Sequence, residues 1–374
     1  MDFTNKNINL LNIHSGLQQF SANIFDSFGV IFLLTIGLPL PIIALVWASN
    51  CIIRSLLRPI YLFFTQKVGL KKALIYGILF NSGLYLVLYK VNGLNNWLLF
   101  YIFYLAICDI AYWLPFHSYY AIAGDKDKRG KQIGVKLSAI AIFQITAPLL
   151  GGIVITHFGF LWIYILATLV MLMSIIPILL AEDKIPGEQM NFKTAIKTID
   201  KRGFVMQVGD GILYLQSFVW TVLVYYLVKN FVIFGGLITL ELFLTSTLFV
   251  LLGFSIDKGN GKKIGLIGLI SLGIVIILRS ILITTIFQVI VTNFLFAIGM
   301  AFYSSAFGVR FYNLSKNSGN TLWFHFFGEL GWDIGAASVL IIGAVFLLIG
   351  VPLQYLLLCS LIGLPIVNVV FKKF

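Results

Sequence analysis

His325, Glu329 and Asp333 repeat at intervals of four residues near the C-terminal end of the sequence. On an α-helix this spacing places the three side chains on one face. Two carboxylates at successive turns repel each other, which favours a shared proton, and a histidine one turn away can accept that proton near neutral pH. The spacing therefore predicts a proton relay. The alternative interpretation is that His325 and Asp333 lie at the two ends of their helix and leave Glu329 alone in its interior.

A second polar stripe lies in the first apolar stretch of the chain. An α-helix turns by about 100° per residue, so the four polar side chains of this stripe fall within an arc of roughly 60° on one helix face. These residues are Asn12, Gln19, Asn23 and Asp26. So narrow a stripe is expected to line a cavity, because lipid offers no hydrogen-bond partners.

Further polar and aromatic residues inside apolar stretches are candidates for the same cavity. They are Asn50, Asn81, Asp109, Trp113, Gln144, Gln207, Gln216, Trp220, Glu241 and Asn293. For each amide alone, a hydrogen bond between helices is the alternative explanation. Only Arg54, Arg58 and Arg279 lie within these stretches, all expected near the ends. We therefore expect most of the buried carboxylates to lack a basic partner, which favours protonation over ion pairing.

The composition identifies the solvent that surrounds these residues. Of the 374 residues, 60% are hydrophobic and 11% are charged, and the mean hydropathy is +0.99. Soluble domains are about 25% charged, so an integral multi-pass membrane protein in a lipid bilayer is expected. We place it in the plasma (inner) membrane of a bacterial or archaeal cell. The net charge of +12 resides in short loops, so nucleic-acid binding is not expected.

Twelve stretches are long and apolar enough to form membrane-spanning helices, which need about 20 residues each. The first six are 9–36, 38–64, 73–91, 96–122, 133–157 and 159–181. The other six are 204–229, 231–254, 264–282, 284–312, 320–347 and 350–371. This division predicts an all-α fold with six-helix bundles at 1–181 and 204–374, joined by a polar linker at 182–203. Residues 192–199 of the linker are expected to form a short surface helix.

The distribution of basic residues predicts the orientation. With the N-terminus in the cytoplasm, only Lys90, Lys229 and Arg279 of the 26 Lys and Arg residues fall on the opposite side. Cytoplasmic loops of membrane proteins are enriched in Lys and Arg. Both termini are therefore expected to be cytoplasmic.

Two polar loops occupy equivalent places after the second helix of each half. They read LFFTQKVGLKK (Leu62–Lys72) and GFSIDKGNGKK (Gly253–Lys263). Their separation of about half the chain predicts two halves of parallel topology.

The second loop resembles the signature loop of the major facilitator superfamily, with a glycine, an acidic–basic pair, a second glycine and two basic residues. The matching residues are Gly253, Asp257, Lys258, Gly261, Lys262 and Lys263, and in the first half Lys67, Gly69, Lys71 and Lys72 remain. The resemblance implies a gating loop, in which glycines allow close packing and the carboxylate caps a helix across the boundary between the halves. The alternative is that basic loops only fix the topology.

A second resemblance to this superfamily is TAPLLGG (Thr146–Gly152), which is similar to the end of its fifth-helix Gly-Pro motif. Proline and paired glycines are expected to bend this helix and to allow close packing.

The resemblance implies a secondary transporter that works by alternating access, and the unpaired carboxylates favour coupling to protons. A small organic solute is the expected substrate, with export as one option for the direction; large organic anions are not expected, because few cations face the cavity. We expect a monomer without cofactor, metal or enzymatic activity, since no nucleotide-binding loop or metal-binding HExxH motif is present. The alternative is a membrane protein without transport activity, either a lipid or sugar transferase or a scaffold.

Overall fold

The computed structural model describes residues 5–125, 128–183, 190–255 and 260–372, and within them it contains helices and no strands. The first-half helices are α1 (Lys6–Thr35), α2 (Leu40–Val68), α3 (Leu70–Tyr89), α4 (Asn96–Ala123), α5 (Arg129–Gln144), α6 (Thr146–Phe158), α7 (Phe160–Met173) and α8 (Ile175–Leu180). The linker contains α9 (Phe192–Thr198). The second-half helices are α10 (Arg202–Val228), α11 (Phe231–Ser255), α12 (Gly261–Ile281), α13 (Ile286–Asn317), α14 (Thr321–Leu348), η3 (Leu353–Ile362) and α15 (Gly363–Phe371).

Eleven helical segments of the described chain are long and apolar enough to cross a membrane. Side-chain caps start several of them: Asn5 accepts a hydrogen bond at the first turn of α1, Asn95 does so for α4, and Asn320 for α14. The prediction of an all-helical membrane protein is confirmed. The predicted linker helix at 192–199 corresponds to α9.

Three predicted spans are each divided into two helices. The span at 159–181 comprises α7 and α8, and the span at 350–371 comprises η3 and α15. The span at 133–157 comprises α5 and α6, with only Ile145 between them. Pro148 accounts for this break, because it has no N–H to donate to the carbonyl group of Gln144, the last residue of α5.

Glycines allow α6 to pack closely against α11, as the sequence predicts for this motif. A Cβ atom on Gly152 would collide with the backbone of Phe231. On α11, a Cβ atom on Gly235 would collide with the backbone of Pro148. The two backbones thus meet at both positions, which holds the first-half and second-half helices together here.

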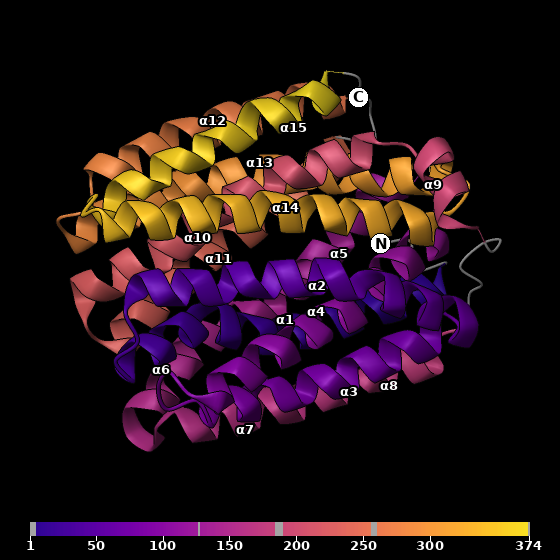
Figure 1. Cartoon of the computed structure of the whole chain (residues 1–374). Helices are drawn as coiled ribbons and strands as arrows, with labels where there is room; N and C mark the ends of the chain where they lie inside the picture. Colours follow the sequence, from indigo (N-terminus) through magenta and orange to yellow (C-terminus); the bar gives the residue numbers. More distant parts are fainter. Residues whose placement is uncertain (1–4, 126–127, 184–189, 256–259, 373–374) are drawn as a thin grey trace.

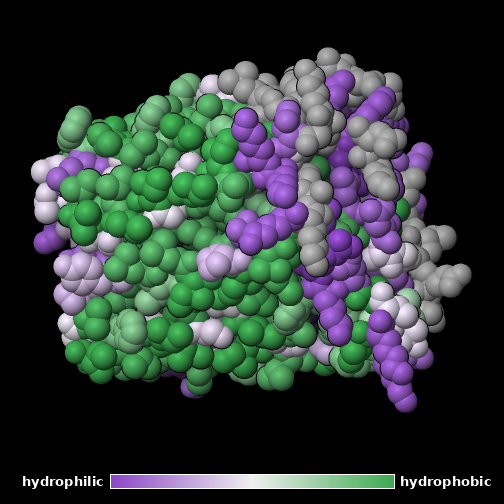
Figure 2. Space-filling model, turned by 90° about the horizontal axis from the view of Figure 1, so that it is seen from above, coloured by the Kyte–Doolittle hydropathy of each residue, from purple (hydrophilic) through white to green (hydrophobic). Residues whose placement is uncertain are grey.

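The first-half and second-half helices form two adjacent groups, shown in indigo to magenta and in rose through orange to yellow in Figure 1. They meet where α2 packs along α14 and where α11 packs along α5 and α6. Both chain termini and α9 lie at one end of the molecule, which we call the termini end. Figure 2 shows hydrophilic residues gathered at this end and a broad hydrophobic surface beside them, as expected for a chain that crosses a bilayer.

Candidate functional site

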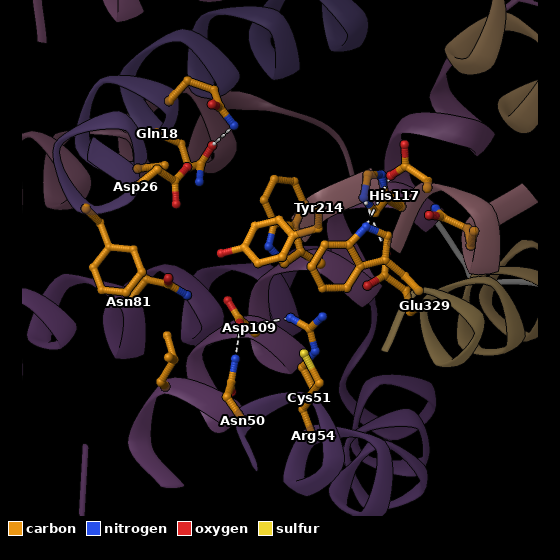
Figure 3. Close-up of a pocket in the computed structure, with 18 of the residues that line it drawn as sticks. Gln18, Asp26, Asn50, Cys51, Arg54, Asn81, Asp109, His117, Tyr214 and Glu329 are labelled. Atoms are coloured by element: carbon orange, nitrogen blue, oxygen red, sulfur yellow. Dashed lines mark hydrogen bonds and ion pairs between the residues drawn. The ribbon is translucent and has the colours of Figure 1, made fainter. Parts of the chain in front are cut away.

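A cavity of about 430 Å³ lies between the two groups of helices. Its walls come from α1, α2, α3, α4 and α7 of the first half and from α10, α13 and α14 of the second. The polar side chains that line it include Gln18, Gln19, Asp26, Asn50, Arg54, Asn81, Tyr85, Asp109, His117, Gln207, Asp210, Tyr214, Tyr312 and Glu329. Figure 3 shows many of them converging from both halves. A cavity of this size suits one small organic molecule.

Asp333 is the centre of an ion-pair network that joins the two halves. Arg54 Nε donates to Asp333 Oδ1, while Arg58 Nη2 donates to Asp333 Oδ2. Ser55 Oγ also donates to Oδ2 over 3.1 Å. Both arginines lie on α2 and the aspartate on α14, so the pairs cross the boundary between the halves. With its side chain fully buried and three donors bound, Asp333 is a well-satisfied carboxylate.

Arg54 extends the network to a third helix. Its Nη1 donates to Asp109 Oδ2 of α4 over 2.9 Å, and Asn50 Nδ2 donates to the same oxygen over 3.1 Å. The guanidinium group also lies over the ring of Trp332, 4.6 Å from the ring centre. Arg54 therefore binds two carboxylates, Asp109 and Asp333, and Arg58 shares Asp333 with it.

Glu329 is held less tightly than Asp333. Its Oε2 lies 3.5 Å from Arg58 Nη1, and its Oε1 lies 3.4 Å from His117 Nε2. Both distances exceed those of a charge-assisted hydrogen bond, about 2.7–2.9 Å. Glu329 also lines the cavity, whereas Asp333 lies behind the wall. Of the two stacked carboxylates, Glu329 is the one from which a proton can reach the cavity directly.

The arginine–carboxylate pairs correct two expectations from the sequence. Arg54 and Arg58 do not lie near an end of their helix but in the interior of α2 (Leu40–Val68), and both bind Asp333. The expectation that most buried carboxylates lack basic partners is wrong for four residues, because each contacts an arginine. These are Asp109, Glu329, Asp333 and Glu241. The missed signal was the spacing of Arg54 and Arg58, which matches that of Glu329 and Asp333 and places both pairs on facing helical surfaces.

His117 of α4, which the sequence reading did not single out, takes the place expected for His325. Its Nδ1 lies 2.6 Å from the Tyr312 hydroxyl, and its ring stacks on Trp113 at 5.2 Å between ring centres. His325 is fully buried and does not line the cavity. Its ring stacks on that of His117 with ring centres 5.5 Å apart, and its Nε2 is hydrogen-bonded to Ser315 Oγ at 2.8 Å. The predicted row of His325, Glu329 and Asp333 is therefore not one hydrogen-bonded chain; Glu329 instead faces a histidine of the other half.

The polar stripe of α1 divides among three environments. Gln19 and Asp26 line the cavity. Asn23 Nδ2 bonds to the Gln19 carbonyl group over 2.7 Å and to Gln144 Oε1 over 3.4 Å, and thereby links α1 to α5. Asn12 is buried, and both polar atoms of its side-chain amide lack a hydrogen-bond partner among the described residues.

Four predicted pathway residues surround Arg279 instead of the cavity. The guanidinium group donates to Gln216 Oε1 and Glu241 Oε2 over 2.6 Å each, and to Asn293 Oδ1 over 2.7 Å. It lies between the rings of Trp220 and Phe296, 4.0 Å from each ring centre. All these residues belong to the second half. The cluster therefore connects four second-half helices, and its residues do not line the cavity.

Ring contacts between the halves lie on both sides of the cavity along the helices. At the termini end, Tyr120 of α4 contacts Tyr312 of α13, with ring centres 5.0 Å apart. At the opposite end, Phe28 of α1 contacts Phe234 of α11 at 5.6 Å between ring centres, and the ring of Trp47 lies tilted against that of Phe218 at 6.2 Å. The halves thus touch through aromatic side chains both above and below the cavity.

The first of the two polar loops, Leu62–Lys72, contacts helices of its own half. Gly69 has a φ of 88°, a left-handed value that favours glycine. Lys71 Nζ donates to the carbonyl groups of Leu179 and Ala181 over 2.8 and 2.7 Å and so caps the C-terminal end of α8. The flanking Lys67 and Lys72 are exposed. This loop binds a helix end by a lysine within one half, and not by a carboxylate across the boundary.

The second loop is only partly described. Gly261 is buried at the start of α12, while Lys262 and Lys263 are exposed. Gly253 belongs to α11. The side chains of Asp257 and Lys258 lie outside the described residues, so the expected cap stays a prediction.

No model of a known protein family matches the sequence, and no curated protein sequence matches it. Solved structures do match over nearly the whole chain. The POT family transporter PepTSo aligns with a TM-score of 0.73 and 12% identity, covering 99% of this chain and 97% of its own. The chain has the fold of the major facilitator superfamily. The fold resemblance expected from the two loops is thereby confirmed.

Two further structures of this superfamily fold agree. FucP, a major facilitator superfamily transporter solved in the outward conformation, aligns with a TM-score of 0.70 and 10% identity, with 98% of each chain covered. The human organic anion transporter MFSD10 (TETRAN) aligns with a TM-score of 0.68 and 12% identity, again over 98% of each chain. Similarity at this level of identity establishes the fold of the chain.

Proposed function

We propose that the chain is a secondary active transporter that moves a small organic solute by alternating access and couples this movement to protons. The observation that carries the proposal is the ion-pair network that joins α2 to α14 at the wall of a cavity shared by both halves. A site between two halves can be opened to either side by rocking one half against the other. The network lies where such a motion must break or form contacts.

The charge balance of the network identifies its proton site. Arg54 and Arg58 carry two positive charges, and the closely bonded Asp109 and Asp333 carry two negative charges. Glu329 is the remaining carboxylate, and its contacts with Arg58 and His117 are longer. A buried network prefers neutrality, because uncompensated charge inside a membrane is costly. We therefore assign the coupling proton to Glu329, with His117 as the group that exchanges it.

Protonation of Glu329 couples to the motion of the halves through these same contacts. A neutral Glu329 loses its attraction to Arg58 of α2 and leaves that arginine to Asp333 alone. An ionised Glu329 attracts both Arg58 and a protonated His117, which belong to the first half. The charge on Glu329 therefore favours the arrangement in which α14 lies against α2 and α4, and its loss favours separation.

The substrate named for one structural neighbour does not fit this cavity. MFSD10 is described as an organic anion transporter. Here four carboxylates and one guanidinium line the cavity: Asp26, Asp109, Asp210, Glu329 and Arg54. This excess of negative charge disfavours an organic anion, as the sequence also predicts.

We further propose twelve membrane spans. The twelfth is formed by α5 and α6 together, because neither helix alone is long enough to cross a membrane. The proposed bundles are 1–181 and 204–374, joined by 182–203, with both termini in the cytoplasm. An even number of spans agrees with the position of both termini at one end (Figure 1). We place this monomer in the plasma membrane of a bacterium or archaeon.

The topology can be tested with single cysteines. In a variant without Cys51, Cys108 and Cys359, cysteines at Lys128 and Lys197 are expected to react only with reagents that reach the cytoplasm. A cysteine at Asn92, in the exposed turn between α3 and α4, is expected to react from outside. Reaction of Asn92→Cys and Lys197→Cys from the same side would overturn the arrangement.

Transport itself is tested in vesicles that contain the purified protein. We expect an imposed pH gradient to drive accumulation of at least one solute from a panel of organic cations, sugars and neutral compounds. A protonophore is expected to abolish the accumulation, because it removes the gradient. If no solute is transported under any ion gradient, a transferase or scaffold role replaces the proposed one.

A further inference from the structure

Asp26 has no bonded partner, unlike the other carboxylates of the cavity. Asp109 binds Arg54 and Asn50, and Glu329 contacts Arg58 and His117. Asp26 lines the cavity with an exposed side chain and makes no hydrogen bond or ion pair with the described residues. A carboxylate in the interior of a membrane-spanning helix needs a proton or a cation, because an isolated charge inside the membrane is costly.

Asp26 is also separated from the cations of the network. In Figure 3, Asp26 and Glu329 lie on opposite sides of Tyr214. Lys136 of α5 offers no ion pair either, since its Nζ lies among the rings of Phe116, Tyr120 and Tyr312, 4.9, 4.7 and 5.5 Å from their centres. The described residues thus supply no positive charge to Asp26.

The other unbalanced carboxylate, Asp210 of α10, reinforces this local negative charge. It accepts hydrogen bonds from the Tyr303 hydroxyl over 2.6 Å and from Trp332 Nε1 over 3.1 Å. These neutral donors stabilise the ionised carboxylate without cancelling its charge. Asp26 of the first half and Asp210 of the second therefore both leave negative charge at the cavity wall.

Aromatic side chains surround the cavity around Asp26. Phe25 stacks near Trp47 at 6.2 Å between ring centres and meets Tyr85 edge-on at 6.4 Å. On the second half, Tyr214 lies 5.2 Å from Trp332. All five residues line the cavity. The faces of aromatic rings attract organic cations, and their area suits an apolar body beside the charge.

We propose that the transported solute is an organic cation with an aromatic or aliphatic body, and that its charged group binds at Asp26. The inference rests on the proposed transport function. It names the substrate class of the same cavity: the unpaired carboxylate takes the positive charge, and the rings of Phe25, Trp47, Tyr85 and Tyr214 take the apolar part. The coupling proton stays with Glu329.

The test is equilibrium binding to the purified full-length protein in detergent, without any gradient. The probes are radiolabelled tetraphenylphosphonium and tetraphenylborate, which have nearly the same shape and opposite charges. We expect saturable binding of the cation and no saturable binding of the anion, each measured in a separate sample. Asp26→Asn is expected to weaken cation binding at least about 10-fold, as for loss of one partner of a desolvated charge pair, whereas Asp26→Glu retains it.

Asp200→Asn is the matched control, because it removes the same charge from a surface pair with Arg202 outside the cavity. It is expected to bind tetraphenylphosphonium like the wild type. The proposal is overturned if the cation does not bind, if tetraphenylborate binds equally well, or if Asp26→Asn binds normally. The last result, with loss of gradient-driven transport, would assign Asp26 to the proton. Because binding is measured without a gradient, a negative binding result does not change the outcome of the vesicle test of proton coupling.

Discussion

Glu329→Gln is expected to abolish solute accumulation driven by a pH gradient while solute exchange across the membrane continues. Glutamine keeps the size of the side chain and its capacity for hydrogen bonds but cannot release a proton. The two arginines remain balanced by Asp109 and Asp333, so the protein should fold normally. The measurement compares accumulation under an imposed pH gradient with exchange of labelled against unlabelled solute at equal pH.

Asp200→Asn again provides the control, because it neutralises an acid outside the cavity and should retain both activities. Accumulation by Glu329→Gln at the wild-type level would show that the proton binds elsewhere. Loss of exchange together with accumulation, in a protein that is still folded, would assign Glu329 to solute binding or to the motion of the halves.

Asp333→Asn is expected to destabilise the protein far more than Glu329→Gln. Two guanidinium groups converge on this carboxylate, and its side chain is fully buried. Breaking a buried ion pair by removing one partner costs about 3–5 kcal/mol of unfolding free energy, because the other charge stays buried. The midpoint of thermal unfolding, followed by size-exclusion chromatography after heating, measures this loss.

A second substitution separates charge balance from side-chain shape. The double variant Asp333→Asn/Arg58→Gln leaves Arg54 opposite Asp109 and removes the unbalanced guanidinium group. It is expected to regain much of the stability but not the transport activity, since Arg58 also contacts Glu329. Equal stability of Asp333→Asn and the wild type would contradict the central place of Asp333 in the network.

The helices could be predicted from the sequence because a lipid environment constrains them strongly. Each spanning stretch must satisfy its backbone groups internally and be about 20 residues long, so apolar length and loop charges predict the segments. The break at Ile145 was foreseen only as a bend. Its position depends on Pro148, which leaves the Gln144 carbonyl group without its usual donor.

The site was less predictable, because it depends on contacts between distant segments. The sequence singled out Glu329 and Asp333 from their spacing, but their partners Arg58 and His117 lie more than 200 residues away and were missed. Polar residues on one helix can also face different neighbours. Gln216, Trp220, Glu241 and Asn293 looked like cavity residues, yet they surround the buried guanidinium group of Arg279, which binds the three polar side chains and lies over the ring of Trp220.

Proton movement driven by a solute gradient alone tests the central claim most directly. Coupling is reciprocal, so a solute gradient must move protons if a proton gradient moves the solute. Vesicles that contain the protein and an internal pH-sensitive dye receive tetraphenylphosphonium on one side, at equal pH and sodium concentration, with the membrane potential clamped. We predict a change in internal pH with the wild type and none with Glu329→Gln. Solute movement by the wild type beyond that of protein-free vesicles, without any pH change or coupled to sodium alone, would contradict proton coupling.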